Sequence, residues 1–208
     1  SAVGMLAEML AGGLNANLGG RDQIPIEVEK QIVKWTSDLF EFPDKASGLF
    51  VTGTSMANLL SVLIARTRQL GISVRQSGLT NTSEQLVAYT SKEAHGCIAQ
   101  AMDLAGLGSA NLRCIDTNEF HQIDIQHLKE TLKADRKKGF TPFYLVGTAG
   151  TVNSGAIDNL SGLADVAREE KLWFHVDGAY GALAKLSPSL SPRLNGIEQA
   201  DSIAFDFH

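Results

Sequence analysis

The chain has 208 residues, of which 44% are hydrophobic and 20% are charged, and its formal net charge is −5. This composition is ordinary for a globular domain, and the negative balance gives no reason to expect the basic face of a nucleic-acid-binding protein. No apolar run reaches membrane-spanning length, so we expect no membrane partner. Cys97 and Cys114 lack CxxC spacing, and we expect buried, reduced thiols in a cytoplasmic protein rather than a disulfide or a metal site.

The N-terminal stretch predicts two helices. The segment AVGMLAEMLAGGLN carries apolar residues at helical spacing. The segment IPIEVEKQIVKWTSDLF opens with Pro25 and has acidic residues in its first turn, and both features are helix start signals. We therefore expect residues 1–45 to form a helical N-terminal segment, followed by a main domain over residues 46–208.

Short β-type runs then alternate with helical runs. Strands are expected at Leu49–Thr52, Leu86–Tyr89, Leu112–Ile115, Phe143–Val146, Trp173–Val176 and Ser202–Phe205. Helices are expected at Ala57–Leu70, Glu93–Leu104, Ile125–Lys137 and Leu160–Lys171, and residues 71–85 are expected to form a polar surface loop. This alternation predicts an α/β fold with a mostly parallel, mixed sheet and helices on both faces.

The segment GTSMA, Gly53 to Ala57, matches the surroundings of the nucleophilic serine in subtilisin-like proteases. That interpretation fails, because those enzymes place Asp and His before the serine, whereas the first histidine here is His95. What remains is a glycine followed by Thr54 and Ser55 at a helix start, where backbone N–H groups favour an anion. An ordinary Ser/Thr cap on a core helix is the alternative.

Three further segments place polar groups beside expected strand ends. SKEAH puts His95 at the entrance of a helix, GTAGTVNSGAID is a glycine-rich turn, and WFHVDGAYGA ends a buried strand at Asp177. A carboxylate at the C-terminal end of an interior strand lies where α/β sheets bind ligands. Its burial is costly unless a cation meets it, so we expect a ligand site at Asp177.

In order along the chain, MLAEMLAGGLN, GTSMANL, SKEAH, GTVNSGAID, HVDGAYGA and ADSIAFDFH resemble the pyridoxal-phosphate-dependent group II amino-acid decarboxylases. This family includes the aromatic-amino-acid, histidine and glutamate decarboxylases. The resemblance covers essentially the whole chain and implies the large domain of the fold-type I (aspartate aminotransferase-like) enzymes, pyridoxal 5'-phosphate as cofactor, and a homodimer with shared active sites. It also implies that the Schiff-base lysine follows His208, so we expect a fragment without the small C-terminal domain.

The resemblance also implies residue roles. Asp177 matches the aspartate that pairs with the pyridine nitrogen, His95 matches the histidine that stacks on the ring, and His208 lies beside the expected lysine; these three are the catalytic candidates. A protonated pyridine ring is the electron sink, and one carboxylate at roughly 4 Å contributes about 4 kcal/mol at an effective dielectric of ~20. The cofactor-binding candidates are Gly53, Thr54, Ser55, His95, Thr151, Asp177, Ala179, Asp206 and His208, and no metal site is expected.

Some positions depart from the family pattern. Asp206 stands where the family often has asparagine, and a carboxylate repels phosphate unless it is protonated or turned toward a donor. Val152 replaces a threonine found in many members, which leaves Thr151 or Asn153 to supply a hydroxyl or amide. His175 points the same way as Asp177, and a core hydrogen bond is the favoured interpretation of it. His121 and His127, in polar segments, are expected at the surface.

The predicted reaction is decarboxylation of an L-amino acid to an amine and carbon dioxide. Aromatic substrates are favoured, although the polar and small Asn15, Asn17 and Gly19 in the expected pocket wall leave glutamate and diaminobutyrate open. An aldehyde synthase or a carbon–carbon lyase with the same cofactor is an alternative. A catalytically inactive paralogue is the other alternative.

Overall fold

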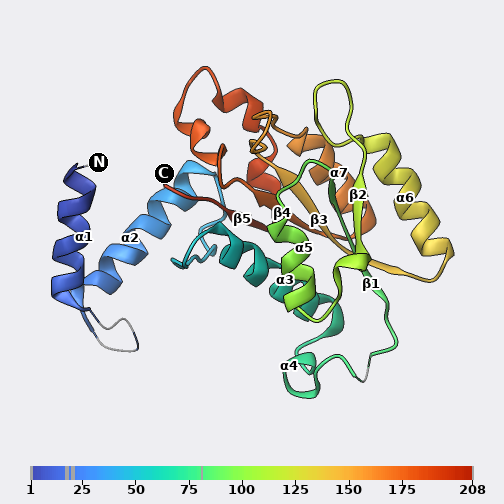
Figure 1. Cartoon of the computed structure of the whole chain (residues 1–208), viewed down its shortest axis with the longest axis horizontal. Helices are drawn as coiled ribbons and strands as arrows, with labels where there is room; N and C mark the ends of the chain where they lie inside the picture. Colours follow the sequence, from blue (N-terminus) through green and yellow to red (C-terminus); the bar gives the residue numbers. More distant parts are fainter. Residues whose placement is uncertain (1, 17–18, 20–21, 81, 208) are drawn as a thin grey trace. The chain divides into compact units, whose positions relative to one another are not determined.

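Figure 1 shows the computed structural model, which describes residues 2–16, 19, 22–80 and 82–207. The chain divides into two compact units, Ser1–Phe50 and Val51–His208. None of the described helices combines the length and the apolarity that crossing a membrane requires.

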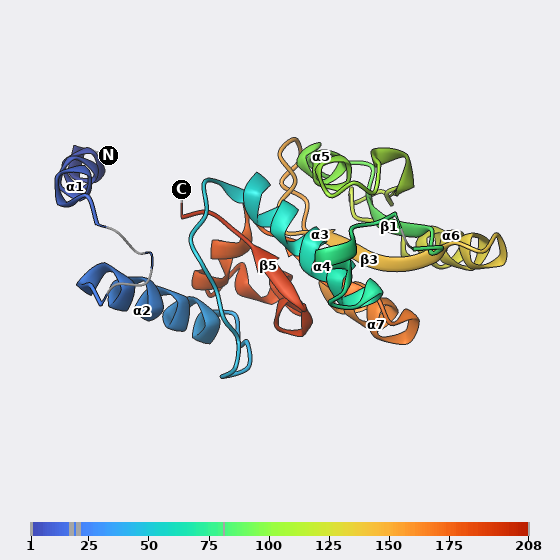
Figure 2. The same cartoon turned by 90° about the horizontal axis from the view of Figure 1, so that it is seen from below.

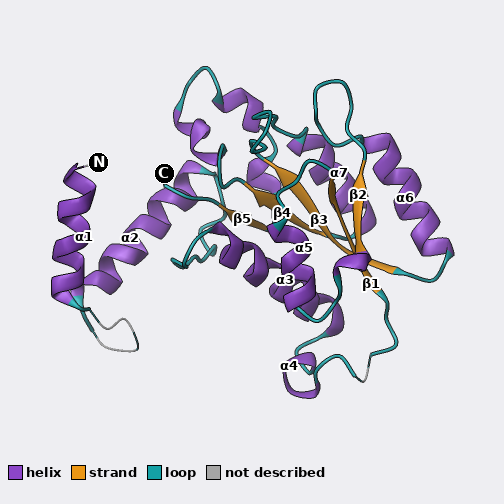
Figure 3. Ribbon diagram, in the orientation of Figure 1, coloured by secondary structure: helices purple, strands orange, loops and turns teal. Residues whose placement is uncertain are grey.

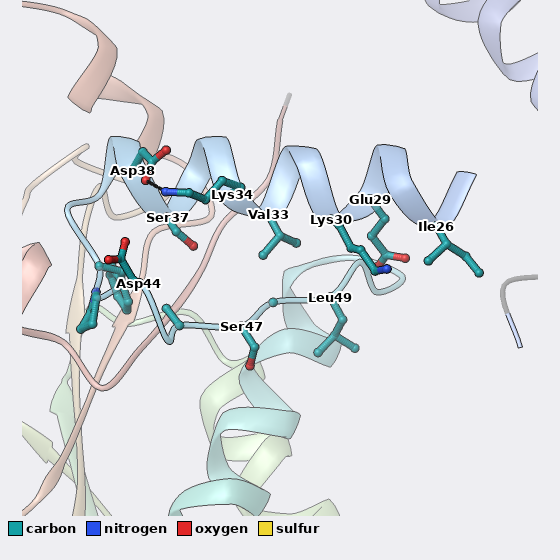
Figure 4. Close-up of a pocket in the computed structure, with 14 residues that line it drawn as sticks. Ile26, Glu29, Lys30, Val33, Lys34, Ser37, Asp38, Asp44, Ser47 and Leu49 are labelled. Atoms are coloured by element: carbon teal, nitrogen blue, oxygen red, sulfur yellow. Dashed lines mark hydrogen bonds and ion pairs between the residues drawn. The ribbon is translucent and has the colours of Figure 1, made fainter. Parts of the chain in front are cut away.

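The N-terminal unit contains two helices, α1 (Ala2–Leu14) and α2 (Ile24–Leu39). None of the described residues of α1 is buried. A groove of about 510 Å³ runs between α2 and the segment 42–49, and Figure 4 shows Val33 and Leu49 among its lining residues. In this groove, a side-chain carbon at Gly48 would lie 3.1 Å from Val33 Cγ1, so α2 packs there on the segment that follows it.

The predicted strand at Leu49–Thr52 is wrong. These residues pair with no strand in the described part of the chain. The backbone N–H of Phe50 instead donates to Glu29 Oε1 at 3.0 Å, so a carboxylate on α2 takes the place of a neighbouring strand. An apolar run without a ladder partner does not become a strand.

The second unit is built on a five-stranded sheet. Its strands are β1 (Leu86–Ser91), β2 (Leu112–Ile115), β3 (Thr141–Thr148), β4 (Trp173–Asp177) and β5 (Ser202–Ala204). They lie in the order β2-β1-β3-β4-β5, and every neighbouring pair is parallel (Figure 3). The predicted α/β class with a mostly parallel sheet is confirmed.

Helices cover both faces of this sheet (Figure 2). The remaining helices are α3 (Thr54–Leu70), α4 (Val74–Ser77), α5 (Cys97–Leu104), α6 (Ile125–Lys137) and α7 (Leu160–Glu170), with short 3₁₀ turns at Ser109–Asn111, Ala182–Leu186, Ser191–Leu194 and Ile197–Gln199. On one face, Val62 of α3 and Ile98 of α5 share a core cluster with Tyr144 and Val146 of β3. On the other face, a side chain at Gly147 would meet Leu163 of α7, so strand alternation separates the two cores.

Three local predictions need correction. Helix α5 begins at Cys97 rather than Glu93, because the carbonyl and hydroxyl of Ser91 accept the N–H groups of Ala94 and Glu93 and form a turn first. The polar loop 71–85 contains α4, whose Val74 is buried. Cys114 is exposed rather than buried, because β2 is an edge strand of the sheet.

The turn after β4 depends on a close approach of two backbones. A side-chain carbon at Gly181 would lie 2.5 Å from the carbonyl oxygen of Ala149 and 3.3 Å from the Cα of Gly150. Only glycine fits between these backbone atoms, and the loops after β3 and β4 are held together there.

We expect Gly181→Ala to lower the free energy of unfolding of the full-length protein by about 1–3 kcal/mol, because the added carbon overpacks a rigid backbone contact. Urea denaturation measures this. Gly96→Ala is the matched control, since Gly96 also has a negative φ (−59°) and open space around its Cα. Equal effects of the two substitutions would contradict the steric explanation.

Candidate functional site

A cavity of about 230 Å³ lies at the carboxyl ends of the strands in the second unit. The predicted site residues that line it are Thr54, Ser55, His95, Thr151, Asp177, Ala179 and Asp206. Gly53 precedes this set as the residue before α3, and His208 lies outside the described residues. Strands β2 and β3 lie on opposite sides of β1, and α/β sheets bind ligands where the strand order reverses in this way.

Asp177 is the last residue of β4, and its side chain is buried. Its Oδ2 accepts a hydrogen bond from Asn58 Nδ2 at 3.1 Å, and its Oδ1 accepts one from the backbone N–H of Ala179 at 3.2 Å. Among the described residues, no Lys or Arg forms an ion pair with it. Burial raises the pKa of the Asp177 carboxyl, so the ionised form is costly unless a cation enters the cavity.

Asn58, which bonds Asp177, and His175, which bonds Asn58, are both fully buried. His175 is 1% exposed, with Nδ1 2.8 Å from Ser202 Oγ and Nε2 2.8 Å from Asn58 Oδ1. Its ring stacks on Tyr144 at 5.8 Å between centroids. Burial lowers the pKa of His175 to about 3, so the ring is neutral near pH 7. The predicted core hydrogen bond of His175 is confirmed.

His95 lies in the turn between β1 and α5 rather than inside the helix. Its Nδ1 accepts the backbone N–H of Cys97, the first residue of α5, at 3.2 Å. This bond places the ring hydrogen of neutral His95 on Nε2 and ties the ring to the start of α5. The helix start thus sets the orientation of a ring that lines the cavity.

Helix α3 starts without a side-chain cap. Gly53 precedes it with a φ of +81°, a conformation that favours glycine. The Thr54 hydroxyl donates instead to Asp206 Oδ2 at 2.5 Å, so the alternative of an ordinary Ser/Thr cap is not what forms. Within the described part of the chain, the backbone N–H groups of Thr54 and Ser55 find no acceptor, which suits an anion.

The loop after β3 is held by its own hydroxyl and carboxyl groups. The Thr151 hydroxyl lies 2.7 Å from Ser154 Oγ and accepts the backbone N–H of Ala156 at 3.2 Å. Asp158 is buried and accepts the backbone N–H groups of Ile123 and Thr148, each at 2.7 Å. The Thr151 hydroxyl therefore already has partners inside its loop.

The sequence interpretation missed Asn58, Cys97 and Tyr180, which also line the cavity. Asn58 had a signal: it is a polar residue one helical turn after Thr54, on the face of α3 that also carries the buried Ser61 and Val62. A buried amide needs partners, and this spacing points toward the strand ends. Within the residues that the structure describes, no group of His, Cys, Asp and Glu is arranged to hold a metal ion.

The two remaining described histidines are His121 and His127. The His121 side chain is 58% exposed and pairs with Glu93, and the His127 side chain is 40% exposed and contacts Asp116. The prediction of surface positions is confirmed for both.

Comparison with known proteins gives a consistent result. A family model described as the pyridoxal-dependent decarboxylase conserved domain matches residues 1–208. An aromatic-L-amino-acid decarboxylase of Bacillus atrophaeus is 39% identical over 210 residues, covering 99% of this chain and 42% of that protein. A 4-hydroxyphenylacetaldehyde synthase of Rhodiola rosea is 31% identical over 219 residues, covering 100% of this chain and 44% of that protein.

The fold has a similar counterpart among solved structures. The glutamate decarboxylase domain of a diaminobutyrate-pyruvate transaminase and L-2,4-diaminobutyrate decarboxylase from Vibrio parahaemolyticus has a TM-score of 0.93 at 35% identity. This match covers 98% of the present chain and 46% of the other. The predicted large domain of the fold-type I enzymes is thereby confirmed. The chain spans less than half the length of these relatives.

We expect His175 to make the full-length protein sensitive to acid. The ring has a pKa of about 3 when folded against an ordinary value of 6.5, so the unfolded state binds more protons below that value. Stability from this residue is fully present above about pH 6.5 and is lost as the pH falls toward 3. When the pH is lowered from about 7 to about 5, the free energy of unfolding should fall by about 2 kcal/mol less in His175→Gln than in the wild type.

Urea denaturation at the two pH values measures this difference. The raised pKa values of Asp177 and Asp158 act in the opposite direction, but they are present in both proteins and cancel in the comparison. Identical pH dependence of wild type and variant would contradict a neutral, buried His175.

Proposed function

The chain belongs to the pyridoxal-dependent decarboxylase family, and from this premise we propose that the full-length protein decarboxylates an aromatic L-amino acid to its amine and carbon dioxide. The observation that carries the proposal is Asp177. It is a buried carboxylate at the end of a central strand, it faces a cavity, and among the described residues no Lys or Arg pairs with it. A cationic ring nitrogen of a bound cofactor offsets the cost of such a group.

Four features of the cavity support pyridoxal 5'-phosphate as its ligand. Asp177 supplies an acceptor for a protonated pyridine nitrogen, and the His95 ring, which lines the cavity and is tied to the start of α5, is our candidate for stacking on the cofactor ring. The start of α3, with Gly53, Thr54 and Ser55, offers unpaired N–H groups to a phosphate. Ala179, next to Asp177 in the cavity, presents only a methyl group to a ring.

When bound, this cofactor supplies an electron sink for the carbanion that decarboxylation leaves. The task of Asp177 is to hold a proton on the pyridine nitrogen. His95 orients the ring, and the start of α3 fixes the phosphate end. The substrate bond that breaks is selected by orientation, which is a positional effect of the whole cavity.

The remaining predicted residues have supporting parts in this proposal. Asp206 accepts a hydrogen bond from the Thr54 hydroxyl on one carboxylate oxygen. This bond turns the Asp206 carboxylate toward a donor beside the proposed phosphate position. Thr151 shapes the loop at the edge of the cavity. We propose His208 as a contact to the cofactor or the substrate, and we assign cofactor binding to residues 46–208.

The aromatic substrate is supported by the 39% identity to the aromatic-L-amino-acid decarboxylase of Bacillus atrophaeus. Because the chain is also similar to the diaminobutyrate decarboxylase domain, the product assay described below includes charged amino acids as substrates. The second candidate is an aldehyde synthase, which the relationship to the Rhodiola rosea enzyme favours.

We also propose a homodimer in the cytoplasm. The exposed apolar residues of α1, which include Met5, Leu6, Met9 and Leu10, support a role for this helix in subunit contact. The two cysteines are free, as is usual for cytoplasmic proteins.

The direct test is a product assay with the full-length protein and added pyridoxal phosphate. We expect carbon dioxide and the matching amine from tyrosine, tryptophan or dihydroxyphenylalanine, with weaker release from glutamate and diaminobutyrate. An aldehyde with hydrogen peroxide would support the synthase instead. No turnover of any amino acid by protein that carries the cofactor would refute both.

We expect Asp177→Asn to retain the cofactor and to lose turnover by about 10³-fold, because the lost interaction with the ring nitrogen is about 4 kcal/mol. Single-turnover kinetics on protein with measured cofactor content check this. Asp135→Asn is the matched control, since Asp135 is equally buried but bonds Tyr89 and Arg113 away from the cavity. Near-normal turnover of Asp177→Asn would contradict the assigned role.

A further inference from the structure

A line of hydrogen bonds crosses β4, β5 and α3 and ends on Asp177. The indole Nε1 of Trp173 donates to Ser202 Oγ at 2.8 Å, and this hydroxyl lies 2.8 Å from His175 Nδ1. His175 Nε2 lies 2.8 Å from Asn58 Oδ1, and Asn58 Nδ2 donates to Asp177 Oδ2 at 3.1 Å. We call these five residues the β4 network.

The two ends of the β4 network fix its direction. An indole nitrogen only donates, and an ionised carboxylate only accepts. The carboxylate of Asp177 therefore requires the NH₂ group of Asn58, which leaves the Asn58 oxygen to accept the ring hydrogen of His175 on Nε2. The Nδ1 of the neutral ring then carries no hydrogen and accepts the hydroxyl hydrogen of Ser202, which itself accepts from Trp173.

Burial makes this direction strict. Asn58 is 0% exposed and His175 is 1% exposed, so a rotated amide has no solvent to satisfy its groups. Rotation of Asn58 would set its oxygen against the Asp177 carboxylate and its NH₂ group against the His175 hydrogen. Both contacts would be repulsive, and each would leave buried polar groups without partners.

We propose that Asn58 and His175 are positioning residues for Asp177, which lock its carboxylate in one rotation by a one-way network of hydrogen bonds. One oxygen is committed to the amide and the other to the backbone N–H of Ala179, and the remaining acceptor positions belong to the cavity side. This inference deepens the proposed function and rests on it. His175 does not line the cavity, and in the β4 network it reaches Asp177 only through Asn58.

The experiment separates a hydrogen-bond role from a packing role. In the full-length protein, His175→Phe keeps a ring that can stack on Tyr144 but has no nitrogen, whereas His175→Gln keeps a side-chain N–H donor. After removal of the cofactor, the dissociation constant for pyridoxal phosphate is measured for each variant. We expect His175→Phe to weaken binding by about tenfold and His175→Gln by less than about threefold, as for loss of one bond in a network that ends on a charged group.

Ser61→Ala is the matched control for a general loss of stability. Ser61 is a buried hydroxyl on α3 that contacts the Asn58 carbonyl and Tyr144, but it lies outside the β4 network. We expect it to lower the unfolding temperature without weakening pyridoxal phosphate binding. Equal binding by His175→Phe and His175→Gln, or equal weakening in Ser61→Ala, would overturn the positioning role.

A second measurement needs no cofactor. Nitrogen-15 NMR of the cofactor-free, histidine-labelled protein, with the His175 signal assigned by its loss in His175→Phe, should show a protonated Nε2 and an unprotonated Nδ1 near pH 7. A hydrogen on Nδ1 would reverse the network and overturn the inference. If the wild type bound no pyridoxal phosphate, the proposed function would fail, and the NMR result would still decide the direction of the network.

Discussion

The buried carboxylate of Asp177 is the constraint on which the structure of the unit from Val51 onward depends. Removal of a carboxylate from water costs several kcal/mol, and two hydrogen bonds from Asn58 and Ala179 offset only part of this. The carboxylate stays buried despite this cost because β4 lies between β3 and β5, and pairing with both strands holds the end of β4 in a fixed register. A ligand that brings positive charge to this point completes the interior, and the family to which the chain belongs is defined by a cofactor of that kind.

Among the described residues, two other buried acids, Asp135 and Asp158, show which partners a carboxylate has when its role is structural. Asp135 accepts hydrogen bonds from the Tyr89 hydroxyl and from two nitrogens of Arg113. Asp158 is held by two backbone N–H groups at 2.7 Å each. Asp135 has a cation within the protein, and Asp158 serves as an anchor for a loop. Asp177 has the same burial but lines a cavity, so the difference lies in partners rather than in exposure.

The regular elements followed from the sequence where local pattern and tertiary packing agree. The helix at Ile125–Lys137 has the predicted limits, because its helical periodicity matches its buried face. The strand at Leu112–Ile115 also has the predicted limits. The run Leu49–Thr52 failed because strand formation depends on a neighbour that composition does not reveal. The late start of α5 came from a single side chain, Ser91, that competes for backbone N–H groups.

The candidate site was predictable in part for the same reason. Residues at strand ends, such as Asp177, carry a positional signal in the sequence, whereas the partnership of Asn58 and His175 joins residues 117 positions apart. Only the packing of α3 on β4 brings them together. Resemblance to a family supplied roles for individual residues, but the direction of the hydrogen bonds required the three-dimensional structure.

Strand β4 carries Trp173, His175 and Asp177 on one face, at every second residue, with Phe174 and Val176 between them in the apolar core. A shift of the whole strand by one residue against β3 and β5 would turn all three of these side chains to the opposite side of the sheet at once, so the register of β4 decides whether the carboxylate reaches the cavity at all.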